Sequence, residues 1–122
     1  MQTSDFTEPD DATVGHAVAA FARAVSDAYG NRLKGIYLFG SRARGDHTPE
    51  SDADIAVILA DDGWDAWAER VRLVDMTYDI LIETGADLQP WPIRESEWRD
   101  PSVHRNPGLV RNMRADALPI EN

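Results

Sequence analysis

The sequence predicts a small α/β or α+β domain in which a mixed β-sheet is flanked by helices. The main observation is the run ADIAVILA, residues 53–60, which is almost continuously apolar, as in a strand buried on both faces beneath helices. It follows another strand-like run and precedes a long stretch with helical spacing, so strand and helix patterns alternate along the chain. This alternation is typical of a sheet covered by helices.

The amino-terminal part predicts an arm, a helix and a strand. Residues 1–11 are acidic and polar and predict a flexible arm, whereas residues 12–122 predict a single domain. Gly30 would end the first helix, and LKGIYLFG, residues 33–40, is rich in β-branched and aromatic residues, as strands are. The apolar positions that predict this helix recur three or four residues apart and are Val14, Val18, Phe21, Val25 and Ala28.

Beyond residue 60 the pattern changes to a long helix and then a third strand. A second apolar stripe predicts a helix to about Thr84 that covers the sheet, with its tryptophans in the core. After Gly85, residues 86–93 predict a strand, and two prolines restrict its far half to a sheet edge or an exit. Residues 94–100 and 106–117 predict short helices. The stripe consists of Trp64, Trp67, Val71, Val74, Tyr78 and Leu81.

The composition narrows the class of function. The formal net charge is −10 and the sequence pI is about 4.5, which opposes attraction to the phosphate backbone, so no direct nucleic-acid binding is expected. There is no cysteine, so any metal must bind through oxygen or imidazole ligands. The chain shows neither a secretory signal pattern nor an apolar run of membrane-spanning length, and we expect a cytoplasmic protein without membrane contact.

The turn after the first strand has the residues of a phosphate-binding loop. Gly40 lets a phosphate approach the backbone closely, and the Ser41 hydroxyl with the N–H groups of a following helical turn could donate to phosphate oxygens. Arg42 and Arg44 would add positive charge. Gly40 and Gly45 have the spacing of a P-loop, but the lysine that a P-loop needs is missing, so that interpretation fails. A plain turn with solvated arginines is the alternative.

Two aspartates open the second strand. Residues two apart in a strand point to one face, so Asp52 and Asp54 can aim their carboxylates at one place. Hard oxygen ligands of this kind suit Mg²⁺, with Mn²⁺ as an alternative. The competing interpretation is a strand entry balanced by neighbouring arginines. His47 lies in the loop before these aspartates, where we expect a solvated histidine and an approach to the substrate is the alternative. His16 and His104 have no spacing that suggests metal ligation, and we assign the histidines no role.

Together these residues resemble a known family. Gly40-Ser41, ten residues and Asp52-x-Asp54 reproduce the GS-x10-D-x-D signature of the DNA polymerase β-like nucleotidyltransferase superfamily. GSRARGD followed by SDADIAVI is similar to its minimal single-domain branch, the MNT antitoxin-type proteins, over residues 33–93. The resemblance implies the polymerase β-like nucleotidyltransferase fold and a third carboxylate on the next strand. Asp87 is our candidate, and Asp79, inside the long helix, is the competitor.

The resemblance also implies a reaction. Two Mg²⁺ ions held by Asp52, Asp54 and Asp87 would assist attack of an acceptor hydroxyl on the α-phosphate of a nucleoside triphosphate, with ATP as the expected donor of AMP. A HEPN-domain toxin would be the acceptor and partner. Two alternatives stay open: a binding module that neutralises its partner by contact, and transfer to the hydroxyl of a small molecule.

Overall fold

The computed structural model describes residues 8–121. Residues 1–7, most of the arm predicted over residues 1–11, lie outside the described residues. The described chain begins its first helix at Asp11, where the side chain of Asp10 accepts a hydrogen bond of 2.8 Å from the backbone N–H of Thr13. This N-cap satisfies one of the free N–H groups at the helix start.

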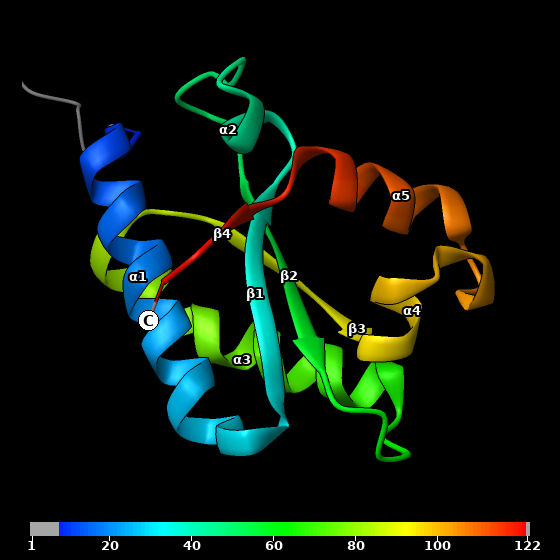
Figure 1. The fold of residues 1–122 in the computed structure, drawn as a ribbon. Helices are drawn as coiled ribbons and strands as arrows, with labels where there is room; N and C mark the ends of the chain where they lie inside the picture. Colours follow the sequence, from blue (N-terminus) through cyan, green and yellow to red (C-terminus); the bar gives the residue numbers. More distant parts are fainter. Residues whose placement is uncertain (1–7, 122) are drawn as a thin grey trace, which may run out of the picture.

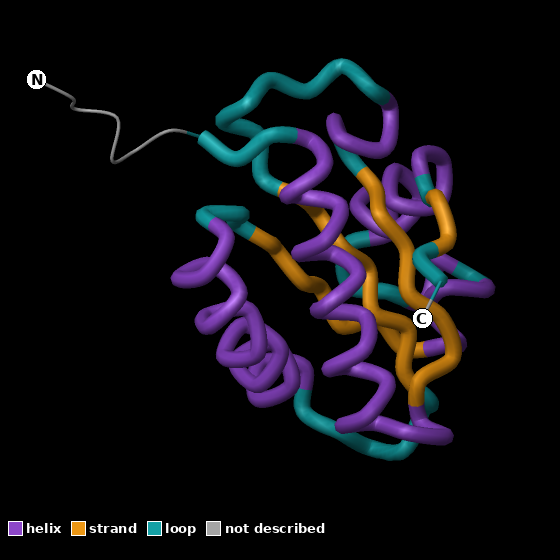
Figure 2. The backbone as a smooth tube through the Cα atoms, turned by 90° about the vertical axis from the view of Figure 1, so that its left-hand side faces the viewer, coloured by secondary structure: helices purple, strands orange, loops and turns teal. Residues whose placement is uncertain are grey.

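The described residues form one four-stranded sheet between two helical layers (Figures 1 and 2). The strands lie in the order β3-β2-β1-β4, with β1 antiparallel to β2 and β4, and β2 parallel to β3. The predicted mixed sheet flanked by helices is confirmed. The elements are α1 (Asp11–Tyr29), η2 (Gly30–Arg32), β1 (Leu33–Phe39), α2 (Ser41–Arg44), β2 (Ala53–Leu59), α3 (Ala66–Thr84), β3 (Leu88–Arg94), α4 (Glu95–Arg99), η3 (Pro101–Val103), α5 (Pro107–Asp116) and β4 (Leu118–Pro119).

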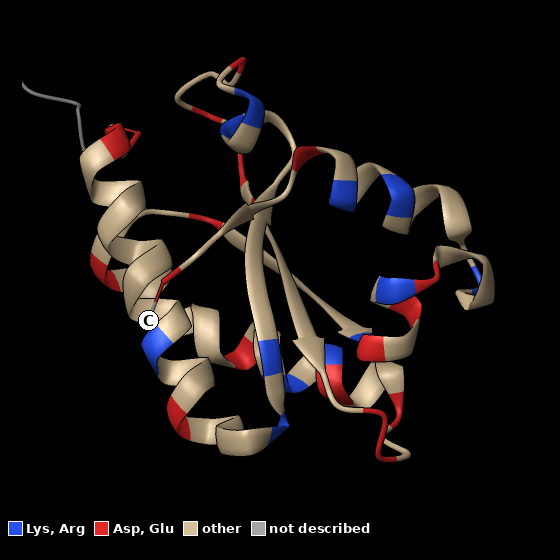
Figure 3. Cartoon of the chain, in the orientation of Figure 1, with Lys and Arg blue, Asp and Glu red and all other residues tan. Residues whose placement is uncertain are grey.

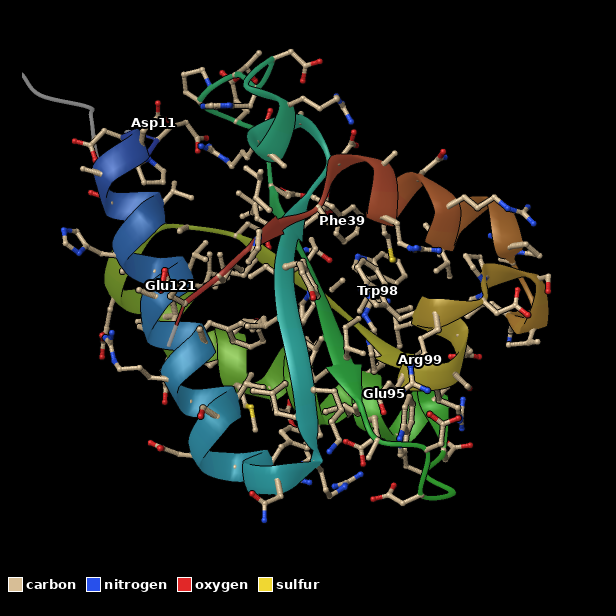
Figure 4. The ribbon with its side chains drawn as sticks, viewed as in Figure 1. Asp11, Phe39, Glu95, Trp98, Arg99 and Glu121 are labelled. Carbon is tan, nitrogen blue, oxygen red and sulfur yellow. The ribbon has the colours of Figure 1, made fainter. Side chains whose placement is uncertain are left out.

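The central strand β2 explains the uninterrupted apolar run because both of its faces are covered. One face, with Ile55 and Val57, packs against α1 and α3. The opposite face, with Ala56 and Ile58, packs against Val110 of α5 and its neighbours. The aromatic side chains of Phe39 and Trp98 lie in this second layer, between the sheet and α4–α5 (Figure 4).

β3 is an edge strand whose outward side carries the two prolines. The backbone N–H of Ala53 donates to the carbonyl of Asp87 at 3.0 Å, and β3 runs parallel to β2 from there. Successive residues of a strand turn their N–H and C=O groups to opposite sides, so Pro90 and Pro92 fall where the N–H would point away from β2. The prolines therefore cost the sheet no hydrogen bonds, as expected for an edge.

The long helix forms as predicted, but its predicted core face is wrong. Trp67 is 73% exposed and Tyr78 is 62% exposed, whereas Leu73 and Thr77 are buried against α1 and the sheet. Trp64 is buried as predicted, but it precedes the helix, and its ring N–H donates to the carbonyl of Ala60 at 2.8 Å. The helix has apolar residues on two faces, and spacing alone does not decide which one is buried.

Three smaller features complete the fold. Ala28, predicted as a core position of the first helix, is exposed, and the adjacent Tyr29 is buried instead. The two-residue strand β4 was not predicted; it pairs with Tyr37 and Leu38 of β1. Among the helices of residues 8–121, none is long and apolar enough to cross a membrane.

Candidate active site

The turn between β1 and α2 brings backbone and carboxylate into close contact. Gly40 has φ 77° and ψ −157°, a conformation that side-chain-bearing residues rarely adopt. A Cβ on Gly40 would lie 2.6 Å from Oδ2 of Asp54, whose partner in the β1–β2 pairing is the preceding residue, Phe39. Ser41 begins α2 directly after this turn. The predicted phosphate-binding pair Gly40 and Ser41 thus lies against one of the predicted metal ligands.

The sheet brings the three predicted carboxylates to one end and one face. Ala53 is opposite Leu88 in the parallel pairing, so the residues just before them, Asp52 and Asp87, are neighbours at the amino ends of β2 and β3. Alternation along β2 turns Asp54 to the same face as Asp52. Acidic positions at the starts of these strands lie near the basic positions of α2 (Figure 3). The competitor Asp79 is exposed on α3.

The electrostatics of this cluster favour a cation. Burial, followed by the negative charge of Asp87 and a side-chain hydrogen bond with it, raises the pKa of Asp52 above its ordinary value. Burial also raises the pKa of Asp54, and Asp87 adds to this increase, whereas the positive charge of Arg44 opposes it. Like charges held close together disfavour ionisation of the group. A divalent cation between them would relieve that repulsion.

The donor set fits a hard divalent cation, although the three carboxylates meet as pairs. Within residues 8–121, no three His, Asp or Glu side chains already surround a common point. Asp52 instead meets Asp87, while Asp54 lies against the Gly40 turn. Carboxylate oxygens are the ligands that Mg²⁺ takes in proteins, usually together with substrate phosphates and water. The suitability of this site for Mg²⁺ therefore rests on the carboxylate ligands and on the negative charge that the three side chains bring together.

Arg42 holds the loop that leads into Asp52. Its side chain is only 6% exposed, and it donates to the carbonyl of Ser51 at 2.9 Å. Longer bonds reach the carbonyls of Thr48 at 3.5 Å and Pro49 at 3.4 Å. All of its described hydrogen bonds go to this loop or to Asp11. Its predicted contact with a nucleotide stays a prediction, whereas its described contacts position the loop.

Asp11 ties the start of α1 to the same loop (Figure 4). Its Oδ1 accepts from Arg42 at 3.3 Å and lies 3.0 Å from Nε2 of His47. The hydrogen bond with His47, more than the one with Arg42, lowers the pKa of Asp11. His47 therefore has a described contact that fastens the loop, although the sequence suggested no role for it.

Arg44 connects α2 to the end of α5. Its guanidinium donates to Asp46 at 3.1 Å and to Asp116 at 2.7 Å, and its side chain is 47% exposed. These two hydrogen bonds raise the pKa of Arg44. The partner Asp116 was not identified from the sequence, because the contact joins residues 72 positions apart.

Two further residues beside the site were missed. Nε2 of Gln89 donates to Oδ1 of Asp87 at 2.9 Å, and Oε1 of Gln89 accepts from Arg70 at 3.4 Å. Gln89 could have been suspected because it lies two positions after Asp87 and so shares its face. Arg70 comes from α3 and carried no such signal. The pair orients the third carboxylate from the edge of the sheet.

The fold and the site together define a small α/β domain with a glycine turn and acidic side chains at one end of a mixed sheet. The chain belongs to the nucleotidyltransferase domain family, whose model matches residues 18–96 and so includes every predicted site residue. It is therefore a member of an enzyme family that transfers nucleotidyl groups.

Two curated relatives come from Methanocaldococcus jannaschii. The chain is 34% identical to the protein named "Putative protein adenylyltransferase MJ0604" over 90 residues, which are 74% of this chain and 86% of the relative. It is 37% identical to "Putative protein adenylyltransferase MJ1379" over 59 residues, which are 48% of this chain and 57% of that protein. The first alignment covers most of both chains.

Solved structures share the fold. A protein of Sulfolobus solfataricus described as a "putative nucleotidyltransferase" superposes with a TM-score of 0.55 at 22% identity, covering 69% of each chain. A structure described as a toxin-antitoxin with AMP-PNP superposes with a TM-score of 0.56 at 22% identity, covering 83% of this chain and 70% of that one. At this identity the likeness concerns the fold.

Proposed function

We propose that this chain is a Mg²⁺-dependent nucleotidyltransferase that transfers AMP from ATP to a hydroxyl group of a protein partner. The observation that carries the proposal is the contact between the Gly40 turn and Asp54, beside the neighbouring carboxylates of Asp52 and Asp87. Family membership supports nucleotidyl transfer, and the relative named a putative protein adenylyltransferase supports a protein as acceptor.

In the proposed reaction the acceptor oxygen attacks the α-phosphorus of ATP. A bond forms between these two atoms, the bond from the α-phosphorus to the bridging oxygen breaks, and pyrophosphate leaves. Asp52, Asp54 and Asp87 would hold divalent cations, which when bound stabilise the charge on the attacking and leaving oxygens. Asp87 lies at the edge of the cluster and would accept the hydroxyl proton. Gly40 and Ser41 would receive the β- and γ-phosphates.

The proposed acceptor is a toxin of the HEPN type, which would make the chain an antitoxin. The motif similarity to antitoxin-type MNT proteins supports this partner, as do neighbours of the same fold described as a toxin-antitoxin with AMP-PNP and as a mutant of the toxin-antitoxin MntA-HpeT. The alternative, a module that neutralises its partner by contact alone, gains no support from the carboxylate cluster, since contact does not require it. Transfer to a small-molecule hydroxyl shares the chemistry and differs in acceptor.

The deciding experiment follows the phosphate that is transferred. The protein is incubated with host-cell lysate, Mg²⁺ and ATP labelled at the α- or the γ-phosphate, alongside the variant Asp52→Asn/Asp54→Asn. A matched control is Asp27→Asn, which removes one exposed carboxylate from α1, away from the site. We expect α-label, and no γ-label, on one discrete protein with wild type and control only.

Other outcomes separate the alternatives. Label on a small molecule would replace the protein acceptor. Equal labelling by wild type and the double variant, or transfer of γ-label, would contradict nucleotidyl transfer at these carboxylates. Neutralisation of a partner that persists unchanged in the double variant would favour the contact mechanism.

A further inference from the structure

The outward side of α3 carries a continuous apolar surface that the core does not use. It runs from the first turn of the helix to the last, about 24 Å at 1.5 Å per residue. Contiguous exposed apolar patches mark interaction sites, whereas single exposed apolar side chains do not. This surface, here called the α3 outer face, consists of Trp67 (73% exposed), Val71 (42%), Val74 (42%), Tyr78 (62%), Leu81 (39%) and Ile82 (68%).

An acidic row borders the α3 outer face on one side. Asp75, Asp79 and Glu83 recur every four residues and are exposed. At 100° per residue Asp75 and Asp79 lie beside Val71 and Ile82, whereas Glu83 is turned further from the outer face. Within residues 8–121, none of the salt bridges involves this row, which we call the acidic border. Arg72, which is exposed on the same side, has its guanidinium 4.6 Å from the centre of the Tyr29 ring, so the acidic border keeps a net negative charge for a partner.

At its amino-terminal end the outer face continues into a groove along the edge strand. Trp67 lines this groove of about 340 Å³ together with Trp91, Leu109 and Arg70, whose guanidinium lies 3.9 Å from the centre of the Trp91 ring. Nε of Arg70 and Nε1 of Trp91 are buried and have no hydrogen-bond partner. Two buried donors without partners indicate that an acceptor group belongs beside them.

One residue of the groove is connected to the candidate active site by hydrogen bonds. The same Arg70 donates to Gln89 at 3.4 Å, and Gln89 donates to the carboxylate of Asp87 at 2.9 Å. A molecule that lies on the α3 outer face and fills the groove would therefore contact the side chain that helps to orient the third carboxylate.

We propose that the α3 outer face and the edge groove dock a protein partner that presents an apolar helix face edged with Lys or Arg. The docking needs neither nucleotide nor metal. Its connection to Asp87 through Arg70 and Gln89 would place the partner on the side of the molecule from which the acceptor hydroxyl reaches the site, and this last step rests on the proposed function.

The negative charge of the acidic border favours a partner with a basic edge over a second copy of this chain. If two α3 outer faces packed antiparallel about a two-fold axis, each acidic border would lie against its own copy and repel it. The net charge of −10 adds repulsion between whole chains and from anionic lipid headgroups. A basic edge on the partner would instead pair with the acidic border.

The test uses two synthetic helical peptides of about 18 residues, or five turns. Both carry the same leucine face, one edged with lysine and the other with glutamate. Binding to the full chain is measured by fluorescence anisotropy without nucleotide, at low and high salt. We expect the lysine peptide to bind at least tenfold more tightly, and salt to weaken it.

Three variants locate the binding. Val71→Ser/Tyr78→Ser changes exposed side chains only and should lower the affinity for the lysine peptide by roughly tenfold. Asp75→Lys/Asp79→Lys should reverse the preference between the peptides. Asp27→Lys, a matched charge change on α1, should leave it unaltered.

Several results would overturn the docking proposal. The first is equal affinity of the wild type for the two peptides. The second is a change of peptide preference in Asp27→Lys as large as that in Asp75→Lys/Asp79→Lys. The third is wild-type affinity for the lysine peptide in Val71→Ser/Tyr78→Ser. Dimerisation in sedimentation that this same serine variant abolishes would assign the surface to a second copy, and binding to phosphatidylcholine vesicles that it abolishes would assign it to a membrane.

Failure of docking and failure of catalysis can be told apart. Asp52→Asn/Asp54→Asn should lose transfer of α-label and keep peptide binding, whereas Val71→Ser/Tyr78→Ser should keep ATP binding and lose transfer to the protein acceptor. Transfer without peptide binding would remove the docking proposal alone. Peptide binding by a wild type that transfers nothing would remove the proposed function alone.

Discussion

At the scale of single residues, the candidate site depends on an absent side chain. Gly40 has a positive φ, and its hydrogen points at the carboxylate of Asp54. Gly45, five residues later, also has a positive φ of 85°, but a Cβ there would have no atom within 4 Å. Replacing Gly45 therefore tests the effect of backbone strain alone, whereas replacing Gly40 also tests the contact with the carboxylate of Asp54.

This contrast predicts different outcomes for Gly40→Ala and Gly45→Ala. Gly45→Ala should lower the free energy of unfolding by about 1–2 kcal/mol, because alanine is strained at positive φ. Gly40→Ala should lower it further, because the new Cβ would also clash with Asp54. Only Gly40→Ala should also displace Asp54, with a loss of transfer rate of about 100-fold. Urea unfolding and labelled-ATP transfer measure the two effects. Equal rate losses in both variants would show that the contact with Asp54 is unimportant.

The raised pKa of Asp54 predicts that its removal stabilises the protein. Because the folded chain holds this proton more tightly than the unfolded chain, folding stability falls as pH rises from the ordinary value of 3.8 through the raised pKa. At pH 7 in EDTA, Asp54→Asn should raise Tm, because the variant has no buried carboxylate to ionise. The gain should shrink below pH 4, and Asp27→Asn should show none. A lower Tm at pH 7 would contradict this account.

At the scale of elements, the loop between α2 and β2 is fastened by a buried arginine rather than by regular structure. Arg42 reaches three carbonyls of this loop and Asp11 of α1. Lysine has no planar fork with which to replace these bonds. The neighbouring Arg44 makes exposed ion pairs and serves as comparison.

Arg42→Lys should therefore cost about 1.5–3 kcal/mol of stability, whereas Arg44→Lys should cost under about 1 kcal/mol. Urea unfolding gives both values, and limited proteolysis should cut the loop faster in Arg42→Lys only. If Arg42→Lys kept wild-type stability but bound ATP less tightly, the predicted contact between Arg42 and the nucleotide would gain support over the structural role.

Most elements could be predicted from the sequence, because strand and helix periods are local. The buried face of α3 could not be, since Leu73 and Val74 are both apolar and only packing against α1 decides between them. The motif identified Gly40, Asp52 and Asp54 as site candidates. The contacts of Asp116 and Arg70 with the site surroundings depend on tertiary placement, which no short pattern records.

At the scale of the whole molecule, three carboxylates lie at one end of the sheet, where a cation would bind. Mg²⁺ that binds the folded chain alone stabilises it by about 2.7 kcal/mol when its concentration is one hundred times Kd. We expect millimolar Mg²⁺ to raise Tm reversibly, EDTA to undo the rise, and Asp52→Asn/Asp54→Asn to remove it. An identical rise in the double variant would place the ion elsewhere.

The outward prolines of β3 limit how another chain can approach this edge. Without N–H groups at Pro90 and Pro92, an incoming strand would leave its own carbonyls unpaired there, so growth of the sheet from molecule to molecule is blocked. Recognition beside this edge must then depend on side chains rather than on backbone pairing. Partner choice could therefore change through single substitutions during evolution while the sheet itself stays intact.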